Sequence, residues 1–454
     1  MKKIKALILS AGKGTRMKSD LPKVIHKVCG KEMVNHVIQS SINAGVDEIV
    51  AILGHGSDLV EKALPKDTKL AFQTEQLGTG HAVIMAKEYI DDNDTIVILC
   101  GDTPLIKSET LKNLFEYHKN NNYHATVLTT TVDNPTGYGR IVRDENYNLL
   151  KIVEQKDANE KEVIIKEINS GIYCFNGKSL KDALSKINNN NAQGEYYLTD
   201  TLEIIRNNGL KIGAFNGANI DELMGVNSRV ELSKAEEIMR KRINEAHMVN
   251  GVTIIDTNST YIESDVEIGN DTIIYPGVML RGKTKIGCNC IIEMNSCIEN
   301  STIKNNVTIK NSTILDSYVD ENTTIGPYAY LRPKSNLGKN VKIGDFVEVK
   351  NATIGNNSKA SHLTYVGDAT VGENVNIGCG VVFVNYDGKN KYKSIVKDNA
   401  FIGSNSNLVA PVIVEEGGYI ATGSTITNDI PEYSLAIARE RQVIKKDWVK
   451  NKNK

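Results

Sequence analysis

Glycines and cations follow the first apolar segment of the chain in an arrangement suited to binding an anion. Residues 9–17 read LSAGKGTRM, and residues 21–23 read LPK. Glycines let backbone amides face an anion, and a helix that starts after such a loop adds partial positive charge. The string lacks the Gly-Lys-Ser/Thr ending of a P-loop, and Met17 stands where a dinucleotide fingerprint would have its third glycine. The sequence therefore predicts a phosphate-binding loop of another kind, with Lys13, Arg16 and Lys23 as its cations.

A histidine far along the chain has neighbours that suit proton transfer from a phosphate-bearing substrate. His362 lies within residues 360–368, ASHLTYVGD, among small and aliphatic side chains. A neutral imidazole can take a proton from an amine at physiological pH, and only the neutral amine is a nucleophile. An isolated histidine is more often a hydrogen-bonded structural residue, but Arg332, Lys350 and the loop at 385–393, NYDGKNKYK, favour catalysis here.

The elements that position the N-terminal loop alternate between strands and helices over residues 1–225. Apolar runs at 5–10, 48–53 and 95–100 indicate strands, and residues 35–44 and 80–89 indicate helices. This alternation predicts an α/β sheet that is mostly parallel. Ligands of such sheets bind at the carboxyl ends of the strands. The glycine loop and the pair Gly101-Asp102 both lie at such ends.

The elements that carry His362 repeat in sixes. Neither an amphipathic helix nor a simple alternating strand has this period, whereas hexapeptide repeats are typical of a parallel β-helix. The repeat slips near 302–324 and 349–354 and breaks at 385–393, and such insertions become loops on one face. An apolar stripe over 235–246 predicts a linking helix before the repeats. The repeating residues include Ile268, Ile274, Leu280, Ile286, Ile292 and Ile298, then Ile325 to Val349 and Ile402 to Ile426.

Composition limits the possible partners and the compartment. The chain has 454 residues, is 40% hydrophobic and has a formal charge of -1, which argues against bulk attraction to nucleic acid or membranes. No apolar run is long enough for a signal peptide core or a membrane span. The seven cysteines are an odd number without a framework spacing, so we expect reduced thiols and a cytoplasmic protein.

Several motifs, taken together, resemble a known family. The string LSAGKGTRM with LPK resembles the phosphate-binding signature of sugar-nucleotide pyrophosphorylases, and QLGTGHA, GDTPL and GYGR follow in the expected order. Downstream, LRPKSNLG, FVEVKNATIG, ASHLTYVGDATVGENVNIGCG, VNYDGKNKYK, IGSNSNLVAPV and AIAR are similar to the bifunctional N-acetylglucosamine-1-phosphate uridyltransferase/glucosamine-1-phosphate acetyltransferase family. Both halves match in the family order, so the resemblance covers nearly the whole chain.

The resemblance implies an α/β Rossmann-like nucleotidyltransferase domain plus a left-handed parallel β-helix of hexapeptide repeats. We expect the pyrophosphorylase (uridylyltransferase) domain over 1–227, a linking helix over 228–250 and the β-helix acetyltransferase domain over 251–454. The resemblance also implies small-molecule substrates and a homotrimer whose acetyl-transfer sites are shared between chains.

For uridyl transfer the resemblance implies a metal-assisted reaction. Asp102 and Asn227 would hold Mg²⁺, while Arg16 and Lys23 would clamp the phosphates of UTP. Mg²⁺ typically takes few protein ligands and completes its shell with phosphate oxygens. The attacking phosphate oxygen is already ionised, so no general base is required. The implied substrate-binding residues are Leu9, Ala11, Gly12, Lys13, Gly14, Arg16, Lys23, Gln73, Gly78, Thr79, Gly139, Glu154 and Asn169.

For acetyl transfer the resemblance implies that His362 takes a proton from the amino group of the sugar. Asn385 would support the geometry at that base and the developing oxyanion. The chain has GCGV at 378–381 where the family usually has GAGT, and Thr422 replaces a common alanine, so the finer CoA contacts stay open; we expect Cys379 to be buried. The implied residues are Arg332, Lys350, Tyr365, Asn376, Asn385, Tyr386 and Lys391 for the sugar phosphate, and Ser404, Thr422 and Arg439 for acetyl-CoA.

The sequence thus predicts an enzyme of two reactions. One acetylates glucosamine 1-phosphate from acetyl-CoA, and the other transfers UMP from UTP to the product, giving UDP-N-acetylglucosamine for cell-wall precursors. A pyrophosphorylase with a purely structural β-helix is the alternative enzyme, against which His362 and its basic neighbours speak. A module that only binds nucleotide sugars is the non-enzyme alternative, and the phosphate-loop cations together with Asp102 and Asn227 argue against it.

Overall fold

A computed structural model describes residues 2–452 of the chain. It divides into two compact units, Met1–Met239 and Arg240–Lys454, and the division falls within helix α8 (Arg229–Val249). The segment expected to link the domains, 228–250, contains this helix; the domain limits themselves stay a prediction. In the described residues no helix combines the length and the apolar character needed to cross a bilayer.

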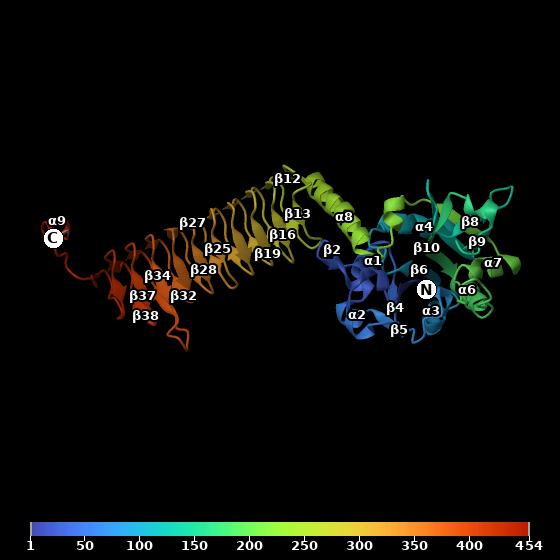
Figure 1. Ribbon diagram of the computed structural model, residues 1–454, viewed down its shortest axis with the longest axis horizontal. Helices are drawn as coiled ribbons and strands as arrows, with labels where there is room; N and C mark the ends of the chain where they lie inside the picture. The colour runs from blue at the N-terminus through green and yellow to red at the C-terminus, as the bar shows by residue number, and fades with distance from the viewer. Residues whose placement is uncertain (1, 453–454) are drawn as a thin grey trace. The chain divides into compact units, whose positions relative to one another are not determined.

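The first unit is built on a mixed sheet with helices around it (Figure 1). Its strands are β1 (Ile4–Ser10), β4 (Glu48–Leu53), β5 (Lys69–Phe72), β6 (Thr95–Cys100), β7 (Ala125–Thr131), β8 (Arg140–Arg143), β9 (Leu149–Val153), β10 (Glu167–Asn176) and β11 (Ile212–Asn216). The main order is β11-β7-β10-β6-β1-β4-β5, with β8 and β9 attached through β10. β1 runs parallel to β4 and β6, while β10 is antiparallel to β6 and β7. The predicted α/β fold is confirmed, but the sheet is mixed and not mostly parallel, because β10 runs against both β6 and β7.

Helices and short 3-10 turns connect these strands. One predicted helix, 80–89, is shorter than expected: α3 ends at Met85, because the N–H of buried Ala86 bonds to both Val83 and Ile84 and a 3-10 turn follows. A two-stranded ribbon, β2 (Lys27–Val28) and β3 (Lys31–Glu32), precedes the first helix. The helical elements are α1 (Met33–Asn43), α2 (Ser57–Ala63), α3 (Thr79–Met85), α4 (Ser108–Asn120), α5 (Glu160–Val163), α6 (Gly177–Leu184), α7 (Asp200–Asn207), η1 (Thr15–Met17), η2 (Lys23–Ile25), η3 (Lys87–Tyr89) and η4 (Ile220–Leu223).

The central strand β1 is apolar on both faces because helices cover both sides of the sheet. Successive side chains of a strand point to opposite faces. Leu7 packs with Ile98 in one core cluster, and Ile8 packs with Leu99 in the other. This burial explains why the segment reads as an unbroken apolar run rather than as an alternating one.

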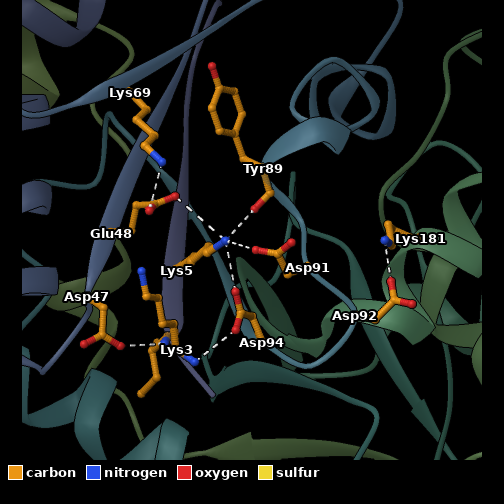
Figure 2. A network of polar contacts seen from close by, with 11 residues as sticks. Lys3, Lys5, Asp47, Glu48, Lys69, Tyr89, Asp91, Asp92, Asp94 and Lys181 are labelled. Carbon is orange, nitrogen blue, oxygen red and sulfur yellow. Dashed lines mark hydrogen bonds and ion pairs between the residues drawn. The ribbon is translucent and has the colours of Figure 1, made fainter. Parts of the chain in front are cut away.

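A buried lysine interrupts the apolar start of β1. Figure 2 shows the ammonium of Lys5 surrounded by acidic side chains, with Asp91 Oδ2 at 2.5 Å, Asp94 Oδ2 at 3.0 Å and Glu48 Oε1 at 3.9 Å. Burial alone would lower the pKa of Lys5, but the hydrogen bonds that its ammonium donates to Asp91 and Asp94 hold the pKa above its ordinary value. This network fixes the amino end of β1, opposite the end that carries the glycine loop.

The second unit is a stack of short parallel strands, drawn as successive coils in Figure 1. Each coil contributes one strand to each of three sheets, and the repeating aliphatic residues Ile274, Leu280, Ile286 and Ile298 point into the core. The six-residue period is the spacing between successive sheets of one coil. The arrangement is consistent with the predicted left-handed β-helix.

Within residues 2–452, the second unit contains three sheets of short parallel strands. The first contains β12 (Thr253–Ile254), β15 (Ile273–Ile274), β18 (Ile291–Ile292), β21 (Thr308–Ile309), β24 (Thr324–Ile325), β27 (Lys342–Asp345), β30 (Lys359–His362), β33 (Asn376–Ile377), β36 (Phe401–Ile402), β39 (Tyr419–Ile420) and β41 (Leu435–Ala436). The second contains β13 (Tyr261–Ile262), β16 (Met279–Arg281), β19 (Cys297–Glu299), β22 (Thr313–Leu315), β25 (Tyr330–Leu331), β28 (Glu348–Lys350), β31 (Tyr365–Gly367), β34 (Val382–Val384), β37 (Asn407–Val409) and β40 (Thr425–Ile426). The third contains β14 (Glu267–Ile268), β17 (Lys285–Ile286), β20 (Thr302–Ile303), β23 (Tyr318–Val319), β26 (Asn336–Leu337), β29 (Thr353–Ile354), β32 (Ala369–Val371), β35 (Ser394–Val396) and β38 (Val412–Val414). A short helix, α9 (Trp448–Asn451), follows the last coil.

Asparagines stabilise one corner of the coils. Asn340, Asn357, Asn374 and Asn399 all have positive φ angles, which asparagine tolerates better than most residues. Their side-chain amides form a ladder with hydrogen bonds of 3.1, 3.2 and 3.3 Å between successive coils. The last step of the ladder spans 25 residues instead of 17, because the loop at 385–393 is inserted in that coil.

Candidate active sites

The loop after β1 turns sharply at a position that requires glycine. Gly14 has a φ of +59°, and a Cβ placed there would lie 2.7 Å from Cβ of Lys23. That approach is too close for any other residue without displacement of Lys23. A Cβ on Gly12, in contrast, would meet nothing within 4 Å. Gly14 therefore brings the loop against Lys23, while Gly12 leaves space beside the loop for a ligand.

A cavity of about 340 Å³ opens beside this loop, at the carboxyl ends of β1 and β6. Parallel sheets bind their ligands at such strand ends. The cavity is also lined by Val24, Gln76, Ala82, Cys100 and Glu195, which the sequence analysis did not assign. The predicted site residues that it brings together are Leu9, Ala11, Gly12, Lys23, Gln73, Gly78, Thr79 and Asp102.

Two glutamines tie the walls of this cavity to each other. Nε2 of buried Gln73 donates a hydrogen bond of 3.1 Å to the carbonyl of Gly78. Nε2 of Gln76 donates one of 2.6 Å to the carbonyl of Ala11, in the glycine loop. Gly78 itself has a φ of +111°, and a Cβ there would lie 2.6 Å from the carbonyl oxygen of Tyr196. The segment around Gly78 and the phosphate loop are thus held as one rigid wall.

Two oxygen atoms converge on one cation at the floor of the site. The Lys23 ammonium contacts Oδ2 of Asp102 and donates a 2.9 Å hydrogen bond to Oδ1 of Asn227. The N–H of Asn227 donates to Oε2 of Glu231 at 2.7 Å, which fixes this turn at the start of α8. Burial, followed by the charge of Asp102, raises the pKa of the neighbouring Cys100 thiol to about 12, so the thiol stays protonated at neutral pH.

This oxygen pair fits a small divalent cation. Carboxylate and amide oxygens are ligands that Mg²⁺ accepts, and it commonly binds one or two protein groups plus phosphate oxygens. Residues 2–452 contain no group of three or more His, Cys, Asp or Glu side chains able to hold a metal. A metal at this place therefore depends on Asp102 and Asn227 together with the phosphates of the substrate.

The other two loop cations lie elsewhere. Lys13 lines an adjoining cavity of about 630 Å³ together with His55, Phe72 and Gln73. The side chain of Arg16 is exposed in η1 and is not among the residues that line either cavity. The structure thus brings Lys23, but not Arg16, to the oxygens of Asp102 and Asn227.

Three of the predicted substrate-binding residues, Gly139, Glu154 and Asn169, are grouped around β10. The N–H of Asn169 donates to the carbonyl of Gly139 at 2.9 Å, and Oη of Tyr173 donates to Oδ1 of Asn169 at 3.0 Å. Burial raises the pKa of Glu154, whose Oε1 lies 3.5 Å from Oγ1 of Thr199. Burial and then the charge of Glu154 raise the pKa of Tyr173, which indicates that this phenol stays neutral. Tyr173 was not predicted, because nothing in its local sequence marks it.

In the second unit, His362 stands on the wall of the prism. Nδ1 of His362 lies 2.5 Å from Oδ1 of Asp345, one coil earlier. The strand register pairs the two residues at the ends of β27 and β30. The side chain of His362 is 59% exposed. The imidazole is therefore held by a carboxylate on one nitrogen and open to solvent elsewhere, which is the arrangement that a general base requires.

Asn385 belongs to a buried polar network beside this wall. Its Nδ2 donates to Oδ2 of Asp368 at 2.5 Å and to Oη of Tyr365 at 3.3 Å. Nζ of Lys350 lies 3.5 Å from the same carboxylate oxygen, and Nδ2 of Asn351 donates to its other oxygen at 2.6 Å. Asp368 therefore organises Asn385, Tyr365 and Lys350. This aspartate lies within one of the family motifs of the sequence, but no role was predicted for it.

Three cations gather near that network. The close approach and the charge of Lys350 lower the pKa of Lys391, with a smaller effect from Arg332. Arg332 also forms a 2.9 Å ion pair with Glu348. A cavity of about 320 Å³ is lined by Asp368, Lys391 and their neighbours. Ammonium groups this close are stabilised by an anion between them, so the cluster suits a phosphate.

The remaining predicted residues lie on nearby coils. Ser404 and Thr422 follow the same corner of the prism as His362, each two residues beyond a residue of the column Ala360, Ile402 and Ile420. A Cβ on Gly423 would lie 3.7 Å from Cδ of Arg439, which puts that exposed arginine beside Thr422.

Asn376, Tyr386 and Cys379 lie on the coils next to His362. Asn376 lies in β33, in register with Lys359. Tyr386 is exposed and its Oη donates to the carbonyl of Gly388 at 2.6 Å. Cys379 is partly exposed, so the expectation of a buried thiol is wrong; the residue lies in the turn between β33 and β34, outside the aliphatic columns that point into the core.

The fold and the two sites define a class of enzyme. A glycine loop with a converging oxygen pair suits nucleotidyl transfer, and an exposed histidine beside a cationic cluster suits a second transfer on the β-helix. Residues 5–220 match the family model described as nucleotidyl transferase.

Relatives over the full length are closely similar. The chain is 76% identical over 449 residues to the bifunctional protein GlmU of Clostridioides difficile (strain 630). The aligned region covers 99% of this chain and 98% of that protein. It is 56% identical over 450 residues to the bifunctional protein GlmU of Alkaliphilus metalliredigens (strain QYMF), with 99% of each covered. The chain therefore belongs to the family of the bifunctional protein GlmU, and the predicted family and two-activity enzyme are confirmed. A crystal structure of UDP-glucose pyrophosphorylase complexed with UDP-glucose covers 53% of this chain at 18% identity and a TM-score of 0.45, a likeness too weak to carry an argument.

Proposed function

We propose that the two sites of this chain catalyse consecutive steps. The β-helix site acetylates glucosamine 1-phosphate with acetyl-CoA, and the N-terminal site transfers UMP from UTP to the resulting N-acetylglucosamine 1-phosphate. Family membership supports both activities, and the two separate sets of polar residues support a division of labour between the units.

In the acetyl transfer, the sugar nitrogen attacks the thioester carbonyl of acetyl-CoA. His362 accepts the proton that the amine loses, and the carbon–sulfur bond breaks to release the CoA thiol. Arg332, Lys350 and Lys391 neutralise the phosphate of the sugar. Asn385, held by Asp368 and Tyr365, supports the geometry at that base and at the developing oxyanion. Tyr365, Asn376 and Tyr386 complete the sugar site, while Ser404, Thr422 and Arg439 face acetyl-CoA.

In the uridyl transfer, an oxygen of the sugar phosphate attacks the α-phosphorus of UTP, and pyrophosphate leaves. Mg²⁺ held by Asp102 and Asn227 would supply charge neutralisation for the phosphates. A metal held by Asp102 and Asn227 would leave the ammonium of Lys23 to contact a phosphate oxygen. Lys13 and Arg16 extend the positive charge along the triphosphate. Gln73, Gly78 and Thr79 contact the base, and Gly139, Glu154 and Asn169 contact the sugars.

One observation carries the assignment of the second activity: the imidazole of His362 is exposed on the wall of the prism and is not enclosed in its core. A histidine in the core would be sealed by the aliphatic columns and could not reach a substrate. An exposed histidine with a carboxylate on one nitrogen can accept a proton on the other.

The assembly and the compartment belong to the same proposal. The chain acts as a cytoplasmic homotrimer on small-molecule substrates, and its acetyl-transfer sites are shared between copies. This part rests on the family resemblance of the β-helix and on the absence of a membrane-spanning helix among the described residues.

The test is one incubation with two independent readouts. Purified full-length protein is mixed with glucosamine 1-phosphate, acetyl-CoA, UTP and Mg²⁺, and the CoA thiol and pyrophosphate are followed separately. We expect both products, with pyrophosphate depending on prior acetylation. A parallel incubation supplies N-acetylglucosamine 1-phosphate directly with UTP and Mg²⁺. Release of pyrophosphate there, with no CoA thiol from glucosamine 1-phosphate in the first mixture, would reduce the β-helix to a structural role.

A further inference from the structure

Asp345 forms a close contact with the predicted base. Its Oδ1 lies 2.5 Å from Nδ1 of His362, 17 residues later in the chain. Both residues end their strands at the same register position, so adjacent coils hold them side by side. Among residues 2–452 no second side chain hydrogen-bonds to this carboxylate, so its polar contact is directed at the imidazole alone.

The backbone fixes this contact. A Cβ on Gly344 would lie 1.9 Å from the carbonyl oxygen of Ser361, so glycine allows the two coils to approach closely just before the pair. The N–H of Leu363 donates to the carbonyl of Asp345 at 2.9 Å, just after it. The backbones of Asp345 and His362 are thus held against each other from both directions, which keeps the carboxylate and the imidazole within reach of each other.

This geometry selects one tautomer of the imidazole. A carboxylate accepts a hydrogen bond, so Nδ1 of His362 must be the donor and carry a proton. In the neutral ring the lone pair then lies on Nε2, the nitrogen turned away from Asp345.

A role in stability explains this pair poorly. The side chains of His362 and Asp345 are 59% and 33% exposed. Pairs at the surface contribute little to stability because water and salt screen them. The orientation of the ring, in contrast, matters wherever a proton must arrive at one particular nitrogen.

We propose that Asp345 is a positioning residue for acetyl transfer, holding His362 with its proton on Nδ1 so that Nε2 accepts the proton of the sugar amine. The inference rests on the proposed role of His362. It adds a second member to the proton-accepting group, contributed by the preceding coil. Neither the motif strings nor the family comparison assigned a role to this aspartate.

The test compares Asp345→Ala and Asp345→Asn with the wild type in the full-length protein. We expect kcat for acetyl transfer to fall by about 10- to 100-fold in both, the range found when a residue that orients a functional histidine is removed. KM for glucosamine 1-phosphate and for acetyl-CoA should change less than about twofold, since Asp345 contacts neither substrate. Uridyl transfer should be unchanged.

A matched control removes another contact between adjacent coils. Glu321 pairs with Lys339 at 3.0 Å across one coil step, so Glu321→Ala removes a comparable contact away from His362. Acetyl transfer should be unchanged in this variant. An equal loss of kcat in Glu321→Ala and Asp345→Ala would mean that the coil contact is merely structural, and the proposal would be wrong.

A spectroscopic readout tests the tautomer directly. With ¹⁵N-labelled histidine, the neutral imidazole of His362 should give signals for a protonated Nδ1 and an unprotonated Nε2 in the wild type. In Asp345→Ala it should give signals for a mixture of the two tautomers. A mixture in the wild type, or wild-type kcat in Asp345→Ala, would overturn the proposal. His362→Ala separates the two claims: if it keeps acetyl transfer, the proposed function fails, whereas if it loses the activity and Asp345→Ala does not, only this inference fails.

Discussion

The side-chain oxygen of Asn227 accepts a 2.9 Å hydrogen bond from the ammonium of Lys23, 204 residues earlier in the chain. The same ammonium contacts Asp102 at the end of β6. Three distant segments therefore meet at one point, and a positive charge already occupies it. A divalent cation held by the two oxygens would replace the ammonium, which could then turn toward the phosphates.

Asp102→Ala tests this arrangement. Removing one of two protein ligands should lower Mg²⁺-dependent uridyl transfer by about 100-fold or more, because little else would hold the metal. Acetyl transfer should be retained, since the β-helix site shares no residue with this one. Initial rates of pyrophosphate and CoA thiol release, measured over a Mg²⁺ titration, check both points.

The control for that experiment is Asp92→Ala, which removes the carboxylate that pairs with Lys181 on the surface (Figure 2). It should leave uridyl transfer unchanged. Full metal-dependent activity in Asp102→Ala would show that this carboxylate is not a ligand.

His362→Ala should have the converse effect. Loss of the general base is expected to lower acetyl transfer by about 10²- to 10⁴-fold, the usual contribution of proton transfer by a positioned side chain. Uridyl transfer should be kept. Parallel assays of both reactions on one preparation provide the measurement, and an equal loss of the two activities would indicate a structural residue.

Gly14→Ala should disable uridyl transfer through geometry alone. The new methyl group would lie 2.7 Å from Cβ of Lys23 in a backbone conformation with φ +59°. Displacing that lysine by a fraction of an ångström or more should cost roughly 10- to 100-fold in kcat/KM. Gly45→Ala is the matched control, because Gly45 has a φ of +95° and nothing within 4 Å of a built Cβ. Equal activity in the two variants would contradict the close approach to Lys23.

Much of the fold could be predicted from periodicity. The six-residue repeat identified the buried columns, since Ile274, Leu280 and Ile298 must all point inward for short strands to be useful. The apolar runs of β1, β4 and β6 were recognised for the same reason: burial on both faces of a sheet imposes a continuous apolar string. The ends of helices were predicted less accurately, since α3 ends at Met85 and not at residue 89.

Partners across coils could not be predicted. Asp345 contacts His362, and Asp368 contacts Asn385, across neighbouring coils. Because coils differ in length, the sequence does not fix which residues lie side by side until every slip and insertion is known. The partial exposure of Cys379 was missed for a related reason: it depends on the position of the residue in the turn between β33 and β34 and not on the thiol itself.

A last prediction concerns pH and the first unit. His118, in α4, is buried and its Nδ1 lies 2.9 Å from Oγ1 of Thr126. Burial, followed by the charges of Lys2 and His124, lowers the pKa of His118 to about 4 from an ordinary value of 6.5. Above pH 6.5 the folded and unfolded states both keep this ring neutral. As the pH falls below 6.5 the unfolded chain gains a proton that the folded state does not accept until about pH 4, so stability is lost across that window.

His118→Gln should remove this dependence. Between pH 7 and pH 5 the free energy of unfolding of the wild type should fall by about 2 kcal/mol more than that of the variant. Urea unfolding followed by ellipticity at 222 nm measures it, since the helices α1 to α7 lie in the first unit. Comparing each protein with itself at two pH values cancels the cost that the substitution has at neutral pH. Exposed His55 provides the control, because His55→Gln should behave as the wild type. Parallel losses in the wild type and His118→Gln would mean that carboxylates, and not this buried ring, govern the acid sensitivity.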